Sequence, residues 1–207
     1  RLFRRQRQMC IRDRYNADMS DKRVLVIAGP PGSGKGKVSD ILQKRGWRAL
    51  SLGDVVREEV KSRGMEPEAE IMGHVAQDLR NEFGPSVIME RILPQVDEFI
   101  QVSHVVIDGV RQIEEMERLQ SSHPRMLVIA IDAPEETRKK RVIGRSRSDD
   151  GGFEERESRE WGWGLKLVMD LADIKIMNDG TPEDFEESIN REPVSYTHLR
   201  AHETEYD

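Results

Sequence analysis

The sequence is poor in cysteine and has no long apolar run. Cys10 is the one cysteine in 207 residues, which excludes a disulfide framework and a thiolate metal cluster. It also favours a reducing, cytoplasmic compartment. No apolar run approaches the roughly 20 residues of a membrane helix, so no membrane partner is expected. The spacing of His74, His104 and His123 does not fit a metal site.

An excess of basic residues is also absent. The chain has 33 Lys and Arg against 39 Asp and Glu, a net charge of −6. Broad nucleic-acid binding needs a basic face, so no nucleic-acid partner is expected. A chain that is 36% hydrophobic and 35% charged suits one globular domain of ordinary size. We expect a monomer or a small homo-oligomer.

The two ends differ from the rest of the chain. Met9–Arg14 and Pro193–His198 can be encoded by opposite strands of the same DNA, as expected of a sequencing adaptor translated at both ends of a fragment. The alternative is a basic targeting arm at one end and a flexible tail at the other. On the adaptor interpretation, residues 1–14 and 193–207 are disordered artefact and residues 15–192 form the domain, with a native start at Met19.

Excluding these ends makes the domain more acidic. The first 14 residues carry six arginines and one aspartate, and the last 15 carry one arginine and three acids. Without them the net charge falls from −6 to −9. A body this acidic still leaves room for a local arginine cluster around a small phosphorylated ligand.

Short apolar runs alternate with amphipathic stretches along the chain. Continuous apolar runs are typical of strands buried in a parallel sheet, and their alternation with helices predicts an α/β fold with helices on both faces of the sheet. Strands are expected at 23–28, 47–52, 104–110, 125–132 and 174–177. Helices are expected at about 35–46, 53–64, 66–84, 85–101 with an interruption at Pro94, 111–122, 134–145, 165–173 and 181–190 with Thr181 as N-cap. The polar segment 146–164 is expected to be mobile at its beginning.

A glycine-rich loop follows the first predicted strand. "GPPGSGKG" has the spacing of a phosphate loop, Gly29-x-x-x-x-Gly34-Lys35. Its glycines let backbone N–H groups turn toward phosphate oxygens, and the lysine reaches the terminal phosphates. A Ser or Thr that meets Mg²⁺ should follow the lysine, but Gly36 and Lys37 stand there.

Two further signals fall at the carboxyl ends of predicted strands. Asp108 ends the run "VVID", where a carboxylate can hold Mg²⁺ or its water shell. Arginines cluster near the same edge, where folds of this class bind ligands, and guanidinium groups suit phosphate oxygens. These arginines are Arg57, Arg111, Arg138, Arg141, Arg145, Arg147, Arg156 and Arg159. Some are expected to be solvated helix charges, with Arg138 the first candidate.

Together these motifs resemble the adenylate kinase and nucleoside-monophosphate kinase superfamily, across nearly all of residues 22–191. "GPPGSGKG" matches the family's GxPGxGKG, and "GDVVR" at residues 53–57 matches its GD-x-x-R. "DGVR" at residues 108–111 is similar to its DG-x-P-R without the proline, and "RVIGR" at 141–145 to its RIVGR. The likeness is strongest to a mostly archaeal branch, described variously as nucleotide kinases, dephospho-coenzyme-A-kinase-like proteins or ATPases. That branch shares "SLGDVVREE", "DG-x-R" and "RSDD…F-x-x-R-x-x-RE".

The resemblance implies a three-layer P-loop NTPase fold with strand order 2-3-1-4-5, an acceptor-binding part at about 52–84 and a short lid at about 146–164. It implies ATP and Mg²⁺ as cofactors and a small phosphorylated acceptor as partner. Its implied donor-binding residues are Gly29, Pro30, Pro31, Gly32, Ser33, Gly34, Lys35, Gly36, Lys37, Arg141, Asn178 and Gly180. Its implied acceptor-binding residues are Gly53, Asp54, Arg57, Asp108, Gly109 and Arg111, with Asp108 near the metal. Its implied catalytic residues are Lys35, Arg57, Arg111, Arg145, Arg147 and Arg156.

The departures from the family pattern keep other functions open. Lys37 replaces the usual Thr or Ser, and Leu52 replaces a Thr that faces the acceptor base. One alternative is a kinase with a hydroxyl acceptor such as dephospho-coenzyme A, with Asp54 or Asp108 as base. Another is an ATP-binding or ATP-hydrolysing regulator with little transfer activity. A GTPase switch is disfavoured because the chain has no Asn-Lys-x-Asp motif.

Overall fold

A computed structural model describes residues 22–144 and 152–198, with side chains described up to residue 191. Its centre is a five-stranded parallel sheet in the order β2-β3-β1-β4-β5. The predicted fold class and strand order are therefore confirmed. The strands are β1 (Val24–Ala28), β2 (Arg48–Ser51), β3 (Val105–Asp108), β4 (Leu127–Asp132) and β5 (Ile174–Met177).

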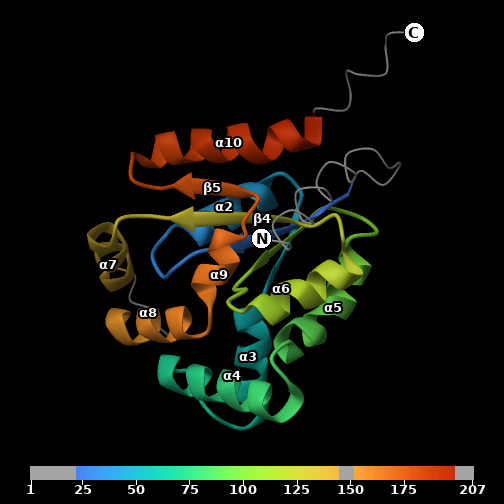
Figure 1. Ribbon diagram of the computed structural model, residues 1–207, viewed down its shortest axis with the longest axis vertical. Coiled ribbons are helices and arrows are strands. Elements are labelled where there is room, and N and C mark those ends of the chain that lie inside the picture. The colour runs from blue at the N-terminus through green and yellow to red at the C-terminus, as the bar shows by residue number, and fades with distance from the viewer. Residues whose placement is uncertain (1–21, 145–151, 199–207) are drawn as a thin grey trace.

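Helices cover both faces of the sheet (Figure 1). Leu25 and Ile27 of β1 pack toward one face with α2 and α10, whereas Val24 and Val26 pack toward the other with α3, α5, α6 and α9. Because successive residues of a strand point to opposite faces, a run such as "VLVIA" must be buried on both sides. The helices are α2 (Lys35–Lys44), α3 (Leu52–Ser62), α4 (Ala69–Phe83), α5 (Val87–Phe99), α6 (Ile113–Ser122), α7 (Glu135–Ile143), α8 (Phe153–Gly162), α9 (Leu165–Asp170) and α10 (Pro182–His198).

The topology places a crevice at the carboxyl edge of the sheet. β2 and β3 lie on one side of β1, and β4 and β5 lie on the other, so the strand order reverses direction at β1. Ligands of open α/β sheets bind at such a switch point. The loop after β1 and the ends of β3 and β4 meet there, since Ile27 pairs with Asp108 and with Ile129.

One local expectation was wrong. Pro94 does not interrupt α5, which runs through it from Val87 to Phe99. The proline is exposed while Ile92, Leu93 and Val96 are buried, so tertiary packing holds the helix despite the missing N–H. The beginning of the polar segment 146–164, which was expected to be mobile, lies outside the described residues. From Phe153, which is buried, the segment forms α8.

Of the two ends predicted to be disordered, residues 1–14 and 199–207 lie outside the described residues. α10 continues to His198, so its backbone includes residues 193–198. Its start follows the sequence prediction: Thr181 Oγ1 accepts from the Asp184 N–H at 3.1 Å, and Asp184 Oδ2 accepts from the Thr181 N–H at 3.0 Å. In the part of the chain that the structure describes, no helix is long and apolar enough to cross a bilayer.

Candidate active site

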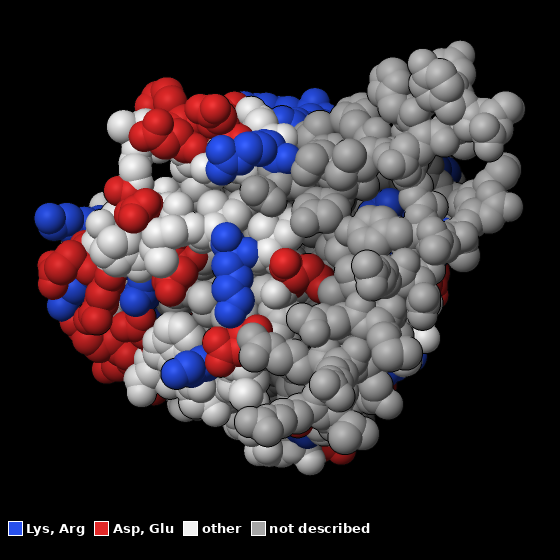
Figure 2. Space-filling model, turned by 45° about the horizontal axis from the view of Figure 1, so that its top comes forward, with Lys and Arg blue, Asp and Glu red and all other residues white. Residues whose placement is uncertain are grey.

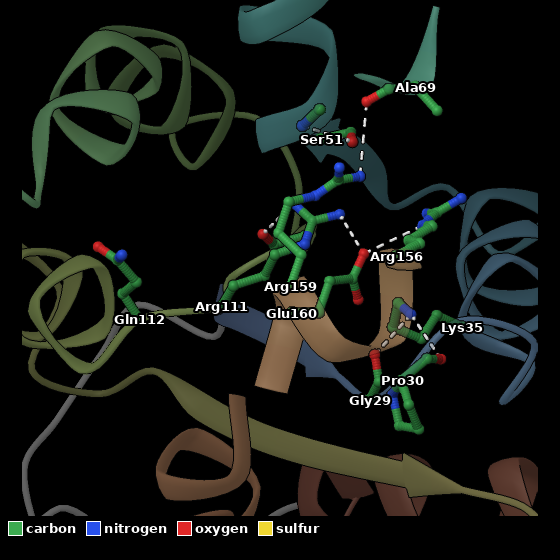
Figure 3. Close-up of polar contacts among 12 residues, drawn as sticks. Gly29, Pro30, Lys35, Ser51, Ala69, Arg111, Gln112, Arg156, Arg159 and Glu160 are labelled. Atoms are coloured by element: carbon green, nitrogen blue, oxygen red, sulfur yellow. Dashed lines mark hydrogen bonds and ion pairs between the residues drawn. The ribbon is translucent and has the colours of Figure 1, made fainter. Parts of the chain in front are cut away.

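The loop between β1 and α2 has the shape of a phosphate cradle. The Ser33 N–H bonds to Pro30 O at 3.2 Å, which closes the turn, and α2 begins at Lys35. Lys35 Nζ donates to the carbonyl oxygens of Gly29 at 2.7 Å and Pro30 at 3.1 Å (Figure 3). The loop thus presents the N-terminus of a helix and a lysine to the same place, as an anion site requires.

Gly32 and Gly34 of this loop have no room for a side chain. Gly32 has φ +77°, and a Cβ there would lie 2.4 Å from the Arg138 carbonyl oxygen. Gly34 has φ +112°, and a Cβ there would lie 2.4 Å from Asn178 Nδ2. The close packing of α7 and of the loop after β5 against the cradle therefore needs glycine at both positions.

Arg141 and Asn178 stabilise the phosphate loop by hydrogen bonds to its carbonyl oxygens. Asn178 is buried and donates from Nδ2 to Ser33 O at 2.8 Å. Arg141 donates to Asn178 Oδ1 at 3.2 Å and to Gly32 O at 3.3 Å. Both residues contact carbonyl oxygens of the loop, so they hold its shape. Gly180 follows in the exposed turn before α10.

Lys37 points away from the cradle. Its Nζ lies 3.2 Å from Glu186 of α10, and both side chains are close to half exposed. Gly36 is exposed and has no side chain. Neither position supplies the hydroxyl that meets Mg²⁺ in the usual motif.

Asp108 and Ser33 offer the oxygens that fit a hydrated magnesium ion. Asp108 Oδ1 and Ser33 Oγ are buried without a hydrogen-bond partner among the described residues. Such orphaned oxygens are costly unless a ligand or water satisfies them. No cluster of three or more His, Cys, Asp or Glu able to hold a metal occurs within residues 22–144 and 152–198. The residues therefore fit Mg²⁺ carried in by a nucleotide and held through water, with Asp108 beside it.

A cavity of about 180 Å³ opens between the cradle, α3, α4 and α8. It brings together most of the residues assigned to the acceptor and to catalysis. Six basic side chains line it, two from α8 and the others from α2, α3, α4 and the loop after β3. The lining includes Lys35, Gly53, Arg57, Arg80, Asp108, Gly109, Arg111, Arg156, Arg159, Glu160 and Trp163. Arg145 and Arg147 lie outside the described residues.

The start of α6 fixes Arg111 at the edge of the cavity. Its backbone N–H donates to Glu115 Oε2 at 3.0 Å, and its Nη1 donates to Gly109 O at 3.2 Å. Burial lowers the pKa of Arg111, but the nearby charges of Glu160, Glu115 and Asp108 outweigh this and raise it. The guanidinium therefore stays charged while partly shielded from water.

Arg80 of α4 is buried in an ion pair. Its Nη2 lies 2.7 Å from Glu115 Oε1, and the two side chains are 4% and 0% exposed. Its guanidinium carbon lies 4.6 Å from the centroid of the Trp163 ring, and Arg111 and Arg159 lie 6.0 and 5.7 Å from that centroid. Trp163 Nε1 donates to Gln77 at 3.0 Å. The indole therefore holds three guanidinium groups together by cation–π contacts.

Two other arginines have partners of their own. Arg57 pairs with Asp54 one helical turn away at the rim of the cavity. Arg138 is buried, where sequence analysis expected a solvated charge: it pairs with Glu157 of α8 and donates to Ala133 O at 2.9 Å. Arg138 therefore ties α7 to α8 and does not reach the cavity.

Comparison with known proteins identifies the family. A family profile described as an AAA domain matches residues 28–156, more than half of the chain. UPF0200 proteins of Thermococcus gammatolerans and Thermococcus onnurineus are 34% and 35% identical to it over 173 residues. Those alignments cover 80% of this chain and 91% and 94% of the relatives. The chain belongs to the UPF0200 family. It shares the P-loop domain that the profile describes.

Other relatives of this UPF0200 chain differ in length or are more distant. A UPF0200/UPF0201 protein of Archaeoglobus fulgidus is 38% identical over 177 residues, 83% of this chain but 55% of that protein. The chain thus spans about half the length of that relative. TT1252 from Thermus thermophilus has a TM-score of 0.56 at 18% identity, covering 82% of this chain and 95% of the other. An uncharacterized Eubacterium ventriosum protein has a TM-score of 0.53 at 17% identity, with 86% and 100% coverage. These two structures support the P-loop fold alone.

Sequence analysis of the UPF0200 chain missed three residues of the site. Arg80 and Glu115 lie on helices, and an amphipathic pattern alone does not show that a charged side chain is buried. Glu160 ends the motif "F-x-x-R-x-x-RE", and an acid directly after a basic i, i+3 pair was the one available signal. In the structure it is 3% exposed and lies 3.1 Å from both Arg111 Nη2 and Arg156 Nε.

The environment of Glu160 keeps it ionised. Burial alone would raise its pKa, but the charges of Arg111, Lys35 and Arg156 outweigh this and lower the pKa from 4.5 to about 2. Burial also lowers the pKa of Lys35, and Asp108 and Glu160 oppose that change. The cluster is thus held together by opposite charges out of water.

This pKa predicts a pH dependence of stability in the UPF0200 chain. Since the folded pKa of Glu160 is below its ordinary value, its stabilising effect is complete above about pH 4.5 and is lost as the pH falls to 2. The free-energy gap between the protein and Glu160→Gln should shrink by about 3 kcal/mol over that window. Urea unfolding from pH 6 to pH 2 measures it, and a gap independent of pH would contradict the assignment.

Proposed function

We propose that this chain transfers a phosphoryl group from ATP–Mg²⁺ to a small phosphorylated acceptor, with nucleoside monophosphates as the first class to test. One observation carries the proposal. Six basic side chains line one cavity beside a phosphate loop, at the edge of the sheet where ligands of this fold bind. Such clusters suit the transfer of phosphoryl groups, whose charge must be neutralised as they move.

The donor is assigned to the cradle. The backbone N–H groups of Gly32, Gly34 and Lys35 and the N-terminus of α2 hold the phosphates, and Lys35 reaches the transferring group. Mg²⁺, when bound with the nucleotide, neutralises charge on the phosphates. Asp108, at the end of β3, would accept hydrogen bonds from water molecules bound to the ion.

The acceptor is assigned to the cavity on the other side of Lys35. The net charge of the residues around the cavity favours the binding of a dianionic group there. The six basic residues face four carboxylates, which leaves two positive charges in excess. The basic residues are Lys35, Arg57, Arg80, Arg111, Arg156 and Arg159, and the carboxylates are Asp54, Asp108, Glu115 and Glu160.

The outer surface of this region carries charges of both signs. Figure 2 shows acidic side chains, with basic ones among them, at the left edge of the molecule, over α7 and α8. The exposed acids there include Glu135, Glu136, Glu154 and Glu155, Lys139 pairs with Glu154, and Lys140 is exposed. Arg156 and Arg159 of α8 instead line the cavity, where the excess of positive charge attracts an anionic substrate.

With an ionised phosphate as acceptor, no general base is needed. Catalysis then rests on holding the two phosphates in line and on excluding water. Arg57 and Arg111 orient the acceptor phosphate, and Arg156 stabilises charge on the group in transit. A hydroxyl acceptor, as in a dephospho-coenzyme-A kinase, would need a base. Asp108, with its unpartnered oxygen, is the better candidate because Asp54 pairs with Arg57.

A substrate panel separates these functions. The protein is incubated with ATP and Mg²⁺ against each nucleoside monophosphate and dephospho-coenzyme A, and ADP is measured. ADP formed only with a monophosphate supports the proposal, and ADP formed only with dephospho-coenzyme A supports the hydroxyl acceptor. Slow ADP release that ignores every acceptor contradicts both and indicates a regulatory ATPase.

Arg57→Ala should act on the acceptor alone. Arg57 lines the acceptor side of the cavity, and its partner Asp54 is 64% exposed, so the loss of Arg57 leaves no buried charge behind. We expect the KM of the acceptor to rise by roughly tenfold or more, as for a lost charge-assisted hydrogen bond. The KM of ATP should change less than twofold. Steady-state kinetics with each substrate varied in turn measures both, and a selective loss of ATP affinity would refute the role.

A further inference from the structure

Glu160 occupies the centre of the basic cluster (Figure 3). Both Arg111 Nη2 and Arg156 Nε contact the same oxygen, Oε1, at 3.1 Å. The carboxylate is therefore bound by two of the guanidinium groups that the proposed function assigns to phosphate. Lys35 also contributes to its electrostatic environment.

The other buried carboxylate of the site shows what a structural role looks like. Glu115 uses one oxygen for Arg80 and the other for the backbone N–H groups of Arg111 and Gln112, so it caps α6. Glu160 caps no helix, and its hydrogen bonds and ion pairs in the described structure go to Arg111 and Arg156. Glu160 therefore interacts with the basic cluster, whereas Glu115 stabilises the start of a helix.

A carboxylate and a phosphate bind guanidinium groups in the same way, through oxygens in the plane of the fork. They differ in charge, because a phosphate monoester carries up to two negative charges and a carboxylate one. From this we propose that Glu160 is a specificity-determining residue that acts as an internal competitor for the acceptor phosphate. This inference rests on the proposed function and deepens that function, since a doubly charged phosphate is named as the group that the site selects.

The physical consequence is selection by charge. An anion that binds Arg111 and Arg156 must take over the contacts that Glu160 makes with them. A singly charged group gains no more than the carboxylate it replaces, so little net affinity remains. A dianionic phosphate gains more from the excess positive charge. The competitor also keeps the arginines charged and in place before substrate arrives, which lowers the reorganisation needed on binding.

The test measures binding of inorganic phosphate to the whole chain by calorimetry at pH 7.5. Glu160→Gln should bind orthophosphate about tenfold more tightly than the unaltered protein, which corresponds to about 1.4 kcal/mol. Glu157→Gln is the matched control. It removes an ion-paired acid one turn earlier on α8, but its partner Arg138 lies outside the cavity, so phosphate affinity should not change.

A double variant tells the cavity from the cradle. If the gain comes from the freed arginines, it should disappear when Arg156→Met accompanies Glu160→Gln. The proposal is overturned if the gain in phosphate affinity persists in the double variant. It is also overturned if Glu160→Gln binds phosphate no more tightly than the unaltered protein. Should Glu160→Gln fail to fold, Glu160→Asp withdraws the carboxylate by one methylene and should show a smaller gain in the same direction.

These outcomes separate the inference from the proposed function. Tighter phosphate binding by Glu160→Gln without turnover of any acceptor supports the competitor and contradicts the kinase. Where an acceptor is phosphorylated, the same variant should lower the acceptor's KM more than it changes kcat. A higher KM would instead mean that Glu160 holds the arginines in place without competing for them.

Discussion

Lys35→Ala should lower the rate of phosphoryl transfer by roughly 1000-fold or more, as for the loss of a charge that stabilises the transition state. Lys35 stands at the start of α2, and its Nζ bonds to two carbonyl oxygens of its own loop. A phosphate can take over those contacts, whereas alanine offers no charge. ADP formation under saturating ATP and acceptor measures the effect.

The fold should survive this change. Lys35 is only partly buried and burial disfavours its charge, so the free energy of unfolding should shift by about 1 kcal/mol or less. Lys37→Ala is the matched control. It removes a lysine two residues away whose partner, Glu186, lies on α10, and it should leave the rate within about twofold. Normal turnover by Lys35→Ala would refute the active site as assigned.

Arg80→Met should destabilise the protein by roughly 3 to 5 kcal/mol, because it leaves a buried carboxylate without its cation. Glu115 is fully buried, and Arg80 also contacts the indole of Trp163. For a domain of this size the melting temperature should fall by roughly 10 °C or more. Thermal and urea unfolding measure both quantities.

Arg91→Met is the comparison for this prediction. Arg91 makes an ion pair of the same length, 2.7 Å, with Glu59, but the two side chains are 35% and 21% exposed. Partly exposed pairs contribute about 1 kcal/mol or less. Equal losses from Arg80→Met and Arg91→Met would mean that burial does not set the value of the inner pair.

The fold was predictable because its signals are local. "VLVIA" and "VVID" are short apolar runs that fit only buried strands, and the glycine-rich loop between a strand and a helix carries its own geometry. Asp108, Arg57 and Arg111 follow strand ends, so topology alone brings them to one edge. Pro94 was misleading because the packing of α5 against α3, α4 and α6 compensates for one missing hydrogen bond.

The inner half of the site could not be predicted because its signals are tertiary. The periodicity of α4 places Arg80 on its apolar face but does not show that the guanidinium stays buried there. Arg63, which follows α3, and Arg91 of α5 are partly exposed. Arg138 was expected on the surface for the same reason. The acids that decide these cases, Glu115 and Glu157, lie 35 and 19 residues away in the chain.

The contact of Trp163 with three guanidinium groups gives the site an optical reporter. Indole emission responds to nearby charge, and Arg111 and Arg159, which lie within about 6 Å of the ring, also line the cavity. Trp47 stacks on His104 instead, with ring centroids 4.5 Å apart, and does not line the cavity. In a chain whose other two tryptophans are changed to phenylalanine, fluorescence would follow the arrival of a ligand in real time without a label.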